Sequence, residues 1–172
     1  MTDSYPYRIS SRTEDVLLLW HRGEGDAKDT LAVDDGGRLL TFAGYQALRK
    51  HCALIGHEFM EDEEETVLDL DTVRRWVEHR LPGHMSAGLL LDAWNSLEDL
   101  ARSVKTAASL PARDAVQDSA YDKLFLFRRN VFATDHGEEA WTAEETAAAR
   151  ELLRAGIGMW EQAVRDSVHV PR

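Results

Sequence analysis

The stretch DVLLLWH at residues 15–21 decides the fold of this 172-residue chain. Its apolar side chains, Val16 to Trp20, follow one another without the alternation of polar and apolar residues that marks a strand with one face in water. Such a run predicts a central strand in a sheet that is covered on both faces. The alternative that remains open is that the run begins as a helical turn.

Three further short strands are predicted around this run, at residues 5–10, 30–34 and 38–42. Glycine-containing turns separate them, among them Asp35-Gly36-Gly37. Because glycine adopts positive φ at little cost, tight chain reversals are expected at these turns. The N-terminal part of the chain is therefore predicted to form an antiparallel meander.

After Thr41 the spacing of apolar residues changes to three or four, which is typical of helices. The last predicted helix opens with Thr142 and Glu145 at the spacing of a capping box, in which each side chain bonds the backbone amide of the other residue. Gly156 and Gly158 permit the close approach of another backbone to this helix. The predicted helices span residues 43–55, 69–80, 86–107, 113–128 and 142–168.

Strands followed by helices predict an α+β fold, with an N-terminal antiparallel sheet followed by a mostly helical C-terminal half. No linker, repeat or change of composition divides the chain, so residues 1–172 are predicted to form a single domain. Within it, residues 1–57 hold the strands and the first helix. Residues 58–172 hold an acidic connection and the remaining helices.

Charge is distributed unevenly along the chain. The 31 acidic and 20 basic residues give a formal net charge of -11, and residues 58–100 alone contain 12 acidic and 3 basic residues. A chain of this sign is repelled by nucleic acid and by anionic lipid, so neither is expected as a partner. No apolar run approaches the roughly 20 residues of a membrane-spanning helix. The first ten residues lack a signal-peptide pattern and Cys52 is the single cysteine, so a cytoplasmic location is expected.

Carboxylates are concentrated in residues 58–71, which contain neither Lys nor Arg. Three interpretations remain open: a solvated segment, a docking face for a basic protein, or a divalent cation site. The absence of glycine from residues 61–65 weakens the cation site, because calcium loops need a sharp turn. The loop between Asn130 and Trp141 is long for its place and is a second candidate. The candidate partner-binding residues are Glu58, Glu61, Asp62, Glu63, Glu64, Glu65, Asp69, Asp71, Asp135, His136, Glu138 and Glu139.

Residue types that carry catalysis form no known pattern in this chain. None of the seven histidines has the i, i+4 histidine partner of a helical zinc site, and the nucleophile motif G-x-S-x-G is absent. Cys52 lies on the apolar stripe of its predicted helix and is expected to be a buried, inert thiol. We therefore predict no catalytic residue, no metal and no cofactor, and an enzyme is the least favoured class of function.

The order of short segments along the chain is distinctive. The strand that ends in Trp20 precedes a Leu39-Leu40-Thr41-Phe42 strand, a helix and the acidic connection. The next segments are LDLD at 68–71 with Trp76, DAWN at 92–95, YDKLF at 121–125 and a last helix preceded by Trp141. This order resembles a family of small bacterial immunity proteins that are encoded beside contact-dependent growth-inhibition toxins.

The resemblance implies a cytoplasmic protein without enzymatic activity that binds the toxin domain of its own lineage, often a nuclease, and blocks its active site. Because nuclease toxins bind a polyanion and tend to be basic, the acidic segment is the expected docking face. The chain departs from the family at Leu126-Phe127-Arg128-Arg129, where a small polar turn is expected. The alternative function is a cytoplasmic regulatory or adaptor module that binds another protein.

Overall fold

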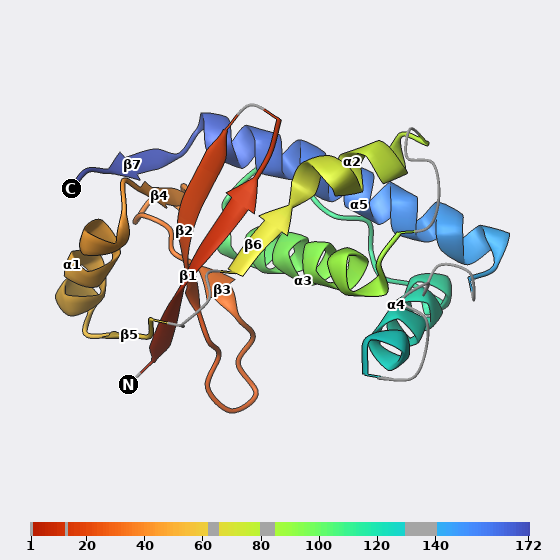
Figure 1. Ribbon diagram of the computed structural model, residues 1–172, viewed down its shortest axis with the longest axis horizontal. Coiled ribbons are helices and arrows are strands. Elements are labelled where there is room, and N and C mark those ends of the chain that lie inside the picture. Colours follow the sequence, from red (N-terminus) through yellow and green to blue (C-terminus); the bar gives the residue numbers. More distant parts are fainter. Residues whose placement is uncertain (1, 13, 62–65, 80–84, 130–140) are drawn as a thin grey trace.

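The computed structural model describes residues 2–12, 14–61, 66–79, 85–129 and 141–172 (Figure 1). It confirms the predicted α+β class, with most strands in the N-terminal part and most helices after them. The strands are β1 (Asp3–Ser10), β2 (Asp15–His21), β3 (Thr30–Leu31), β4 (Leu40–Phe42), β5 (Glu58–Phe59), β6 (Thr66–Asp69) and β7 (Val168–Val170). The helices are α1 (Tyr45–Ile55), α2 (Leu70–Val77), α3 (Ala87–Ser103), α4 (Ala115–Arg129) and α5 (Ala143–Arg165).

The main sheet is mixed. Strand β2 pairs antiparallel with β1 on one side and with β3 on the other, as the predicted meander requires. Strands β5 and β6 then pair with the free edge of β1 in the parallel direction, which the sequence analysis did not foresee. The acidic connection thus contributes strands to the sheet rather than only a loop.

The predicted strand at residues 38–42 keeps an antiparallel bridge to the preceding segment, between Val33 and Leu39, but also pairs outside the meander. It forms β4, which pairs in parallel with β7 at the C-terminal end of the chain in a separate two-stranded sheet. Helix α5 ends at Arg165, not at Val168 as predicted, because the chain turns at Asp166 and continues as β7. The amide of Val168 then donates to the carbonyl of Leu39 at 2.9 Å.

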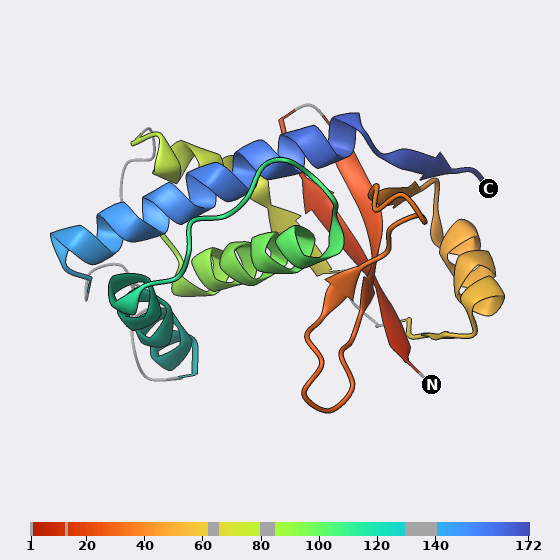
Figure 2. The same ribbon diagram turned by 180° about the vertical axis from the view of Figure 1, so that it is seen from behind.

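Strand β2 is buried on both faces, as its sequence predicts. Val16 and Leu18 face the larger core, which they share with α2, α3 and α5. Leu17 and Leu19 face a smaller core beneath α1 and β4. All four side chains are at most 5% exposed. Figures 1 and 2 show α1 on one side of the sheet and α2, α3 and α5 on the other.

Three helix ends lie at the capping residues that the sequence predicts, whereas α3 ends at Ser103 and not at residue 107. Gly56 ends α1 in the left-handed conformation, with φ 74°. Asp69 caps α2, and its Oδ1 accepts from the amide of Thr72 at 2.9 Å. The capping box of Thr142 and Glu145 opens α5, with both reciprocal hydrogen bonds formed. In the described part of the chain, no helix is both long and apolar enough to cross a membrane.

Helix α3 is the centre of the larger core. Trp94 on this helix is fully buried, and Leu97 is 1% exposed. Helix α5 approaches α3 closely at Gly156, where an added Cβ would lie 2.6 Å from Leu97 Cδ1 and 3.0 Å from Leu97 Cβ. A Cβ at Gly158 would meet no atom within 4 Å. Of the two predicted glycine contacts, only Gly156 therefore serves helix packing.

These two glycines make a matched pair for testing the α3–α5 contact. Gly156→Ala should lower the free energy of unfolding by about 1–3 kcal/mol, since buried Leu97 cannot move away from the new methyl group. Gly158→Ala should raise it by about 0.5–1 kcal/mol, because alanine favours an exposed helical position. Urea denaturation followed by circular dichroism measures both. Equal effects of the two substitutions would contradict the close contact.

Candidate functional site

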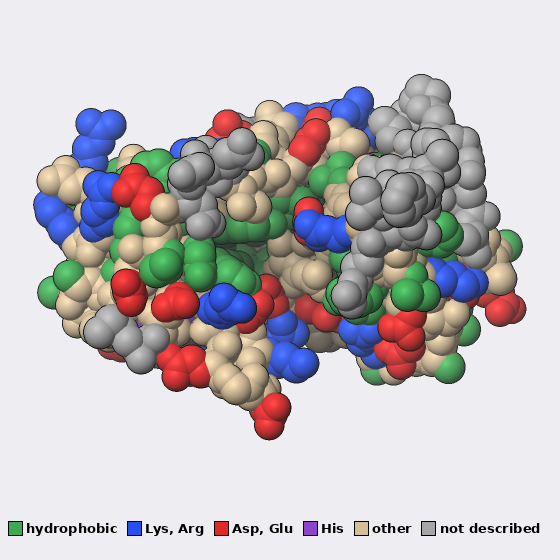
Figure 3. Space-filling model, turned by 60° about the horizontal axis from the view of Figure 1, so that its bottom comes forward, with side chains coloured by type: hydrophobic (Ala, Val, Ile, Leu, Met, Phe, Trp, Pro, Cys, Tyr) green, Lys and Arg blue, Asp and Glu red, His purple; other side chains and the backbone are tan. Residues whose placement is uncertain are grey.

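A groove with a volume of about 1000 Å³ lies between the main sheet and helices α3 and α4. Figure 3 looks onto this face, on which Lys, Arg, Asp and Glu side chains stand around a hollow. We call it the charged groove. The residues used below to describe it are Tyr7, Trp20, Asp29, Asp92, Asn95, Ser96, Glu98, Asp99, Arg102, Arg113, Tyr121 and Arg128.

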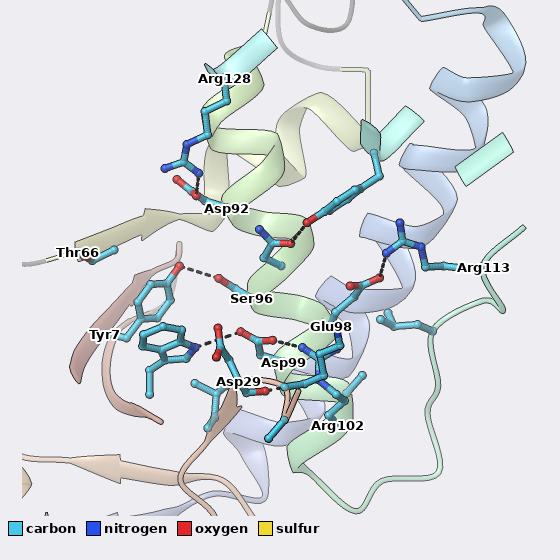
Figure 4. A pocket seen from close by; sticks show the side chains of 18 residues that line it. Tyr7, Asp29, Thr66, Asp92, Ser96, Glu98, Asp99, Arg102, Arg113 and Arg128 are labelled. Carbon is cyan, nitrogen blue, oxygen red and sulfur yellow. Dashed lines mark hydrogen bonds and ion pairs between the residues drawn. The ribbon is translucent and has the colours of Figure 1, made fainter. Parts of the chain in front are cut away.

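Helix α3 supplies one wall of the groove through a polar stripe. Asp92, Ser96 and Asp99 are spaced by four and three residues, so they lie on one face of the helix. The opposite face carries Leu90 and Trp94, which are fully buried in the core. The amphipathic pattern that fixes α3 in the core thus also presents the polar side chains to the groove (Figure 4).

On the sheet side, Trp20 of β2 contacts the carboxylate of Asp99. Its Nε1 donates to Asp99 Oδ2 at 3.2 Å, and Arg102 binds the other oxygen of the same carboxylate. Asp99 is 8% exposed. Burial raises the pKa of this carboxyl to about 6, although the bonds from Trp20 and Arg102 oppose the increase. A carboxylate with a perturbed pKa in a cleft marks a candidate functional position.

Tyr7 of β1 also lines the groove on the sheet side. Its hydroxyl is 2.6 Å from the hydroxyl of Ser96 on α3. Burial raises the pKa of Tyr7 to about 12, so the phenol is neutral at physiological pH. The bond to Ser96 therefore links sheet and helix through two neutral hydroxyl groups.

On the helical side of the groove, the guanidinium group of Arg113 contacts two carboxylates and an aromatic ring. Its Nη1 donates to Glu98 at 3.2 Å and its Nε donates to Asp118 at 2.8 Å. The guanidinium carbon lies 4.6 Å from the centre of the Tyr121 ring, within the range of a cation–π interaction. Tyr121 in turn donates its hydroxyl to Asn95 Oδ1 at 2.8 Å.

A further ion pair closes the groove at its rim, between Arg128 of α4 and Asp92 of α3 (Figure 4). Both side chains are nearly half exposed. Arg128 belongs to the segment Leu126 to Arg129, where the resemblance led us to expect a small polar turn. Helix α4 instead continues through Arg129 and brings an arginine to the groove.

The three carboxylates that α3 contributes to the groove, Asp92, Glu98 and Asp99, are paired with arginines. No histidine or cysteine is among the described residues that line the groove. The arrangement can hold charged and aromatic groups of a ligand, because aromatic faces and charges of both signs stand close together.

The predicted partner-binding residues of the acidic segment separate into two groups. Glu58 lies exposed in β5, and exposed Glu61 forms an ion pair with Arg49 of α1. Asp69 caps α2, and half-buried Asp71 lies in its first turn. None of these four carboxylates lines the charged groove.

The other predicted partner-binding residues lie outside the described residues. They are Asp62, Glu63, Glu64 and Glu65 of the acidic segment and Asp135, His136, Glu138 and Glu139 of the predicted loop.

Cys52 is buried in the smaller core, as predicted, and is 1% exposed. Burial raises the pKa of its thiol, which keeps it in the unreactive protonated form. Among the described residues, no group of three His, Cys, Asp or Glu side chains is placed to hold a metal ion. The absence of a bound metal stays a prediction.

The sequence analysis missed the groove because its partners lie far apart in the chain. Trp20 and Asp99 are 79 residues apart, and Tyr7 and Ser96 are 89 residues apart. The polar stripe on α3 was the available signal. This stripe does not reveal a site by itself, because the solvent-facing side of any amphipathic helix is polar.

Comparisons with known proteins leave the function open. The sequence matches no protein-family model and no curated protein sequence. Among solved structures, the chain is similar to the C-terminal domain of SatS, whose crystal structure was determined in complex with bromine. The alignment covers 96% of this chain and 93% of that domain, with 14% sequence identity and a TM-score of 0.41. A similarity of this size carries no argument about function.

Proposed function

We propose that this protein binds a basic partner protein without catalysing a reaction, and that the charged groove holds an extended segment of that partner. The observation that carries the proposal is the set of carboxylate–arginine pairs and aromatic faces in the groove. The resemblance seen in the sequence favours one form of this function, the neutralisation of a toxin domain in the cytoplasm.

The chemistry of the groove supports binding better than catalysis. A nucleophile needs an adjacent base that takes its proton, and the hydroxyls of Tyr7 and Tyr121 bond instead to neutral groups of Ser96 and Asn95. The carboxylate of Asp99 is engaged by Trp20 and Arg102. The hydrogen bonds among these side chains hold them in fixed positions. A surface with fixed side chains is suited to the recognition of a ligand.

The α3 wall of the groove suits basic side chains. Its α3 wall contributes three carboxylates and one guanidinium, whereas Arg113 and Arg128 come from outside α3. The carboxylates of the α3 wall can exchange their partly exposed arginines for a cation of the partner at small cost, since such ion pairs contribute only about 0–1 kcal/mol. The guanidinium group of Arg113 lies over the ring of Tyr121. An arginine of the partner can stack in the same way on another aromatic ring of the groove.

The size of the groove and the charge of the chain point to a polypeptide. About 1000 Å³ is at the upper end of the range for small-molecule sites. The net charge of -11 attracts a basic partner over a distance and accelerates its association. In this proposal the acidic segment steers the partner and the groove holds it.

An adaptor that binds a basic protein for another purpose would use the same groove. The two forms of the function are separated by capturing the partner from the native host with the tagged protein and identifying it by mass spectrometry. The captured protein is then expressed alone and together with this chain. A partner that kills cells alone and is harmless in the co-expression supports immunity, and a harmless partner supports the adaptor.

The contribution of the groove is tested by a charge reversal at its rim. Asp92→Lys should weaken binding of the captured partner by about 10-fold or more, because it replaces an attractive contact with a repulsive one. Glu151→Lys changes the net charge equally at an exposed position of α5 and should alter the affinity less than about 2-fold. Calorimetry measures both. Equal affinities of the two variants would contradict binding in the groove.

The contribution of the acidic segment is tested by reversing four of its charges, with Lys in place of Glu61, Glu63, Glu64 and Glu65. The association rate should fall by about 10-fold or more at low salt, and the difference should shrink at high salt as the field is screened. Surface-binding kinetics at two ionic strengths measure this.

A control with the same net charge reverses exposed carboxylates elsewhere, at Glu14, Asp35, Asp122 and Glu151. If this control associates as slowly as the segment variant, overall charge is responsible and the segment has no special part in docking.

A further inference from the structure

Two histidines that lie 36 residues apart in the chain meet at a buried serine. The hydroxyl of Ser4 on β1 lies 2.7 Å from Nδ1 of His21 and 3.1 Å from Nδ1 of His57. The two Nδ1 atoms are 3.3 Å apart, and the rings meet edge to face with centroids 4.8 Å apart. Ser4 itself is fully buried. We call Ser4, His21 and His57 the histidine cluster.

The histidine cluster joins the sheet to α1 and β5. Ser4 and His21 face each other across the β1–β2 pair. His57 follows Gly56, the cap of α1, and precedes β5, whose Phe59 pairs with Ser4. The side chain of Cys52 on α1 also interacts with Ser4. Contacts around one hydroxyl group thus fasten α1 and β5 to the N-terminal end of β1.

The geometry of the cluster requires at least one neutral imidazole ring. The two Nδ1 atoms are too close for both to carry a proton, so one ring donates from Nδ1 to the Ser4 hydroxyl and the hydroxyl donates to the unprotonated Nδ1 of the other ring. Addition of a second proton to each ring would place two positive charges on rings whose centroids are 4.8 Å apart in a partly buried site. Burial, together with the charges of His57 and His51, lowers the pKa of His21 to about 4.

Charged groups around the cluster do not offset such protonation. His51 of α1 acts on His21 with the same sign as His57 does, and its own pKa is lowered by burial and by His57. Cys52 is neutral because burial raises its pKa. Glu58 of β5 is exposed. The cavity that His21 and His51 line also contains Asp34, which is paired with Arg38, exposed Asp35, and Arg102, which is paired with Asp99.

The division of the core allows this part of the molecule to open by itself. Strand β2 separates the smaller core, which includes Leu48 and Cys52 of α1, from the larger core of α2, α3 and α5. We propose that the histidine cluster is an acid-sensitive latch, whose protonation releases α1 and β5 from the sheet while the larger core stays folded. This proposal is independent of the function proposed for the groove.

The direction of the pH effect follows from linkage. His21 binds its proton less readily in the closed structure than in an open one, so the open form takes up more protons as the pH falls below the ordinary pKa of histidine, about 6.5. The closed form should therefore lose stability as the pH falls from about 6.5 toward 4, and regain it when the pH is raised.

Cys52, the single cysteine of the chain, reports the opening directly. The probe is 4,4′-dithiodipyridine, which reacts with thiols in mild acid. The labelling rate is divided by that of the protein unfolded in guanidinium chloride at the same pH. This ratio should rise by about 10-fold or more between pH 7.5 and pH 4.5 in the native protein. An unchanged ratio would overturn the proposal.

Hydrogen exchange separates local from global opening in the same samples. The amides of α3 should stay protected at pH 4.5, because the larger core does not contain the cluster. If the amides of α3 lose protection together with those of α1, acid unfolds the whole domain and the latch is refuted.

Two variants test the residues. His21→Asn keeps a polar partner for Ser4 but cannot be charged, and its labelling ratio should vary less than about 2-fold between the two pH values. His169→Gln removes an exposed histidine of β7 and should behave as the native protein.

If His21→Asn does not fold, an NMR titration of the histidine rings in the native protein decides the matter. One ring should protonate well below the usual range. Ordinary titration of every ring would refute the proposal, and so would stoichiometric zinc in the purified protein, since a metal would occupy the Nδ1 atoms.

Discussion

Strand β2 has to bury both of its faces, and the rest of the structure depends on this constraint. Leu17 and Leu19 point to one side, Val16 and Leu18 to the other, and each pair needs its own apolar cover. The helices after α1 cover one face and α1 with β4 covers the other. Because each buried aliphatic side chain contributes roughly 1.5–3 kcal/mol, the larger core contributes much more to stability than the smaller core beneath α1 and β4.

The same alternation places two polar sites at one end of β2. Trp20 follows the direction of Leu18 and contacts Asp99 in the charged groove, whereas His21 follows Leu19 and joins the histidine cluster. Both residues pair with the short strand β3, through Leu31 and Thr30. Polar chemistry therefore gathers where the apolar run of β2 ends.

The extent to which the sequence predicts this structure depends on the range of the interactions. The capping box at Thr142 and the burial of β2 on both faces depend on residues that are neighbours in the sequence, so both were predictable. Pairing of β4 with β7 was not, because Val168-His169-Val170 becomes a strand only when Leu40 lies beside it. The groove and the histidine cluster were missed for the same reason, since their members meet only after the chain has folded.

The two polar sites differ in how they are anchored, which decides what can move. Strand β3 is held by α3, because Ser103 Oγ accepts from the amide of Leu31 at 2.8 Å and donates to the carbonyl of Asp99 at 2.6 Å. Trp20 is held by the carboxylate of Asp99. These bonds attach the groove side of β2 to the larger core. Helix α1, in contrast, reaches the sheet through the smaller core and the histidine cluster, so in the proposed acid opening it can leave while the groove keeps its walls.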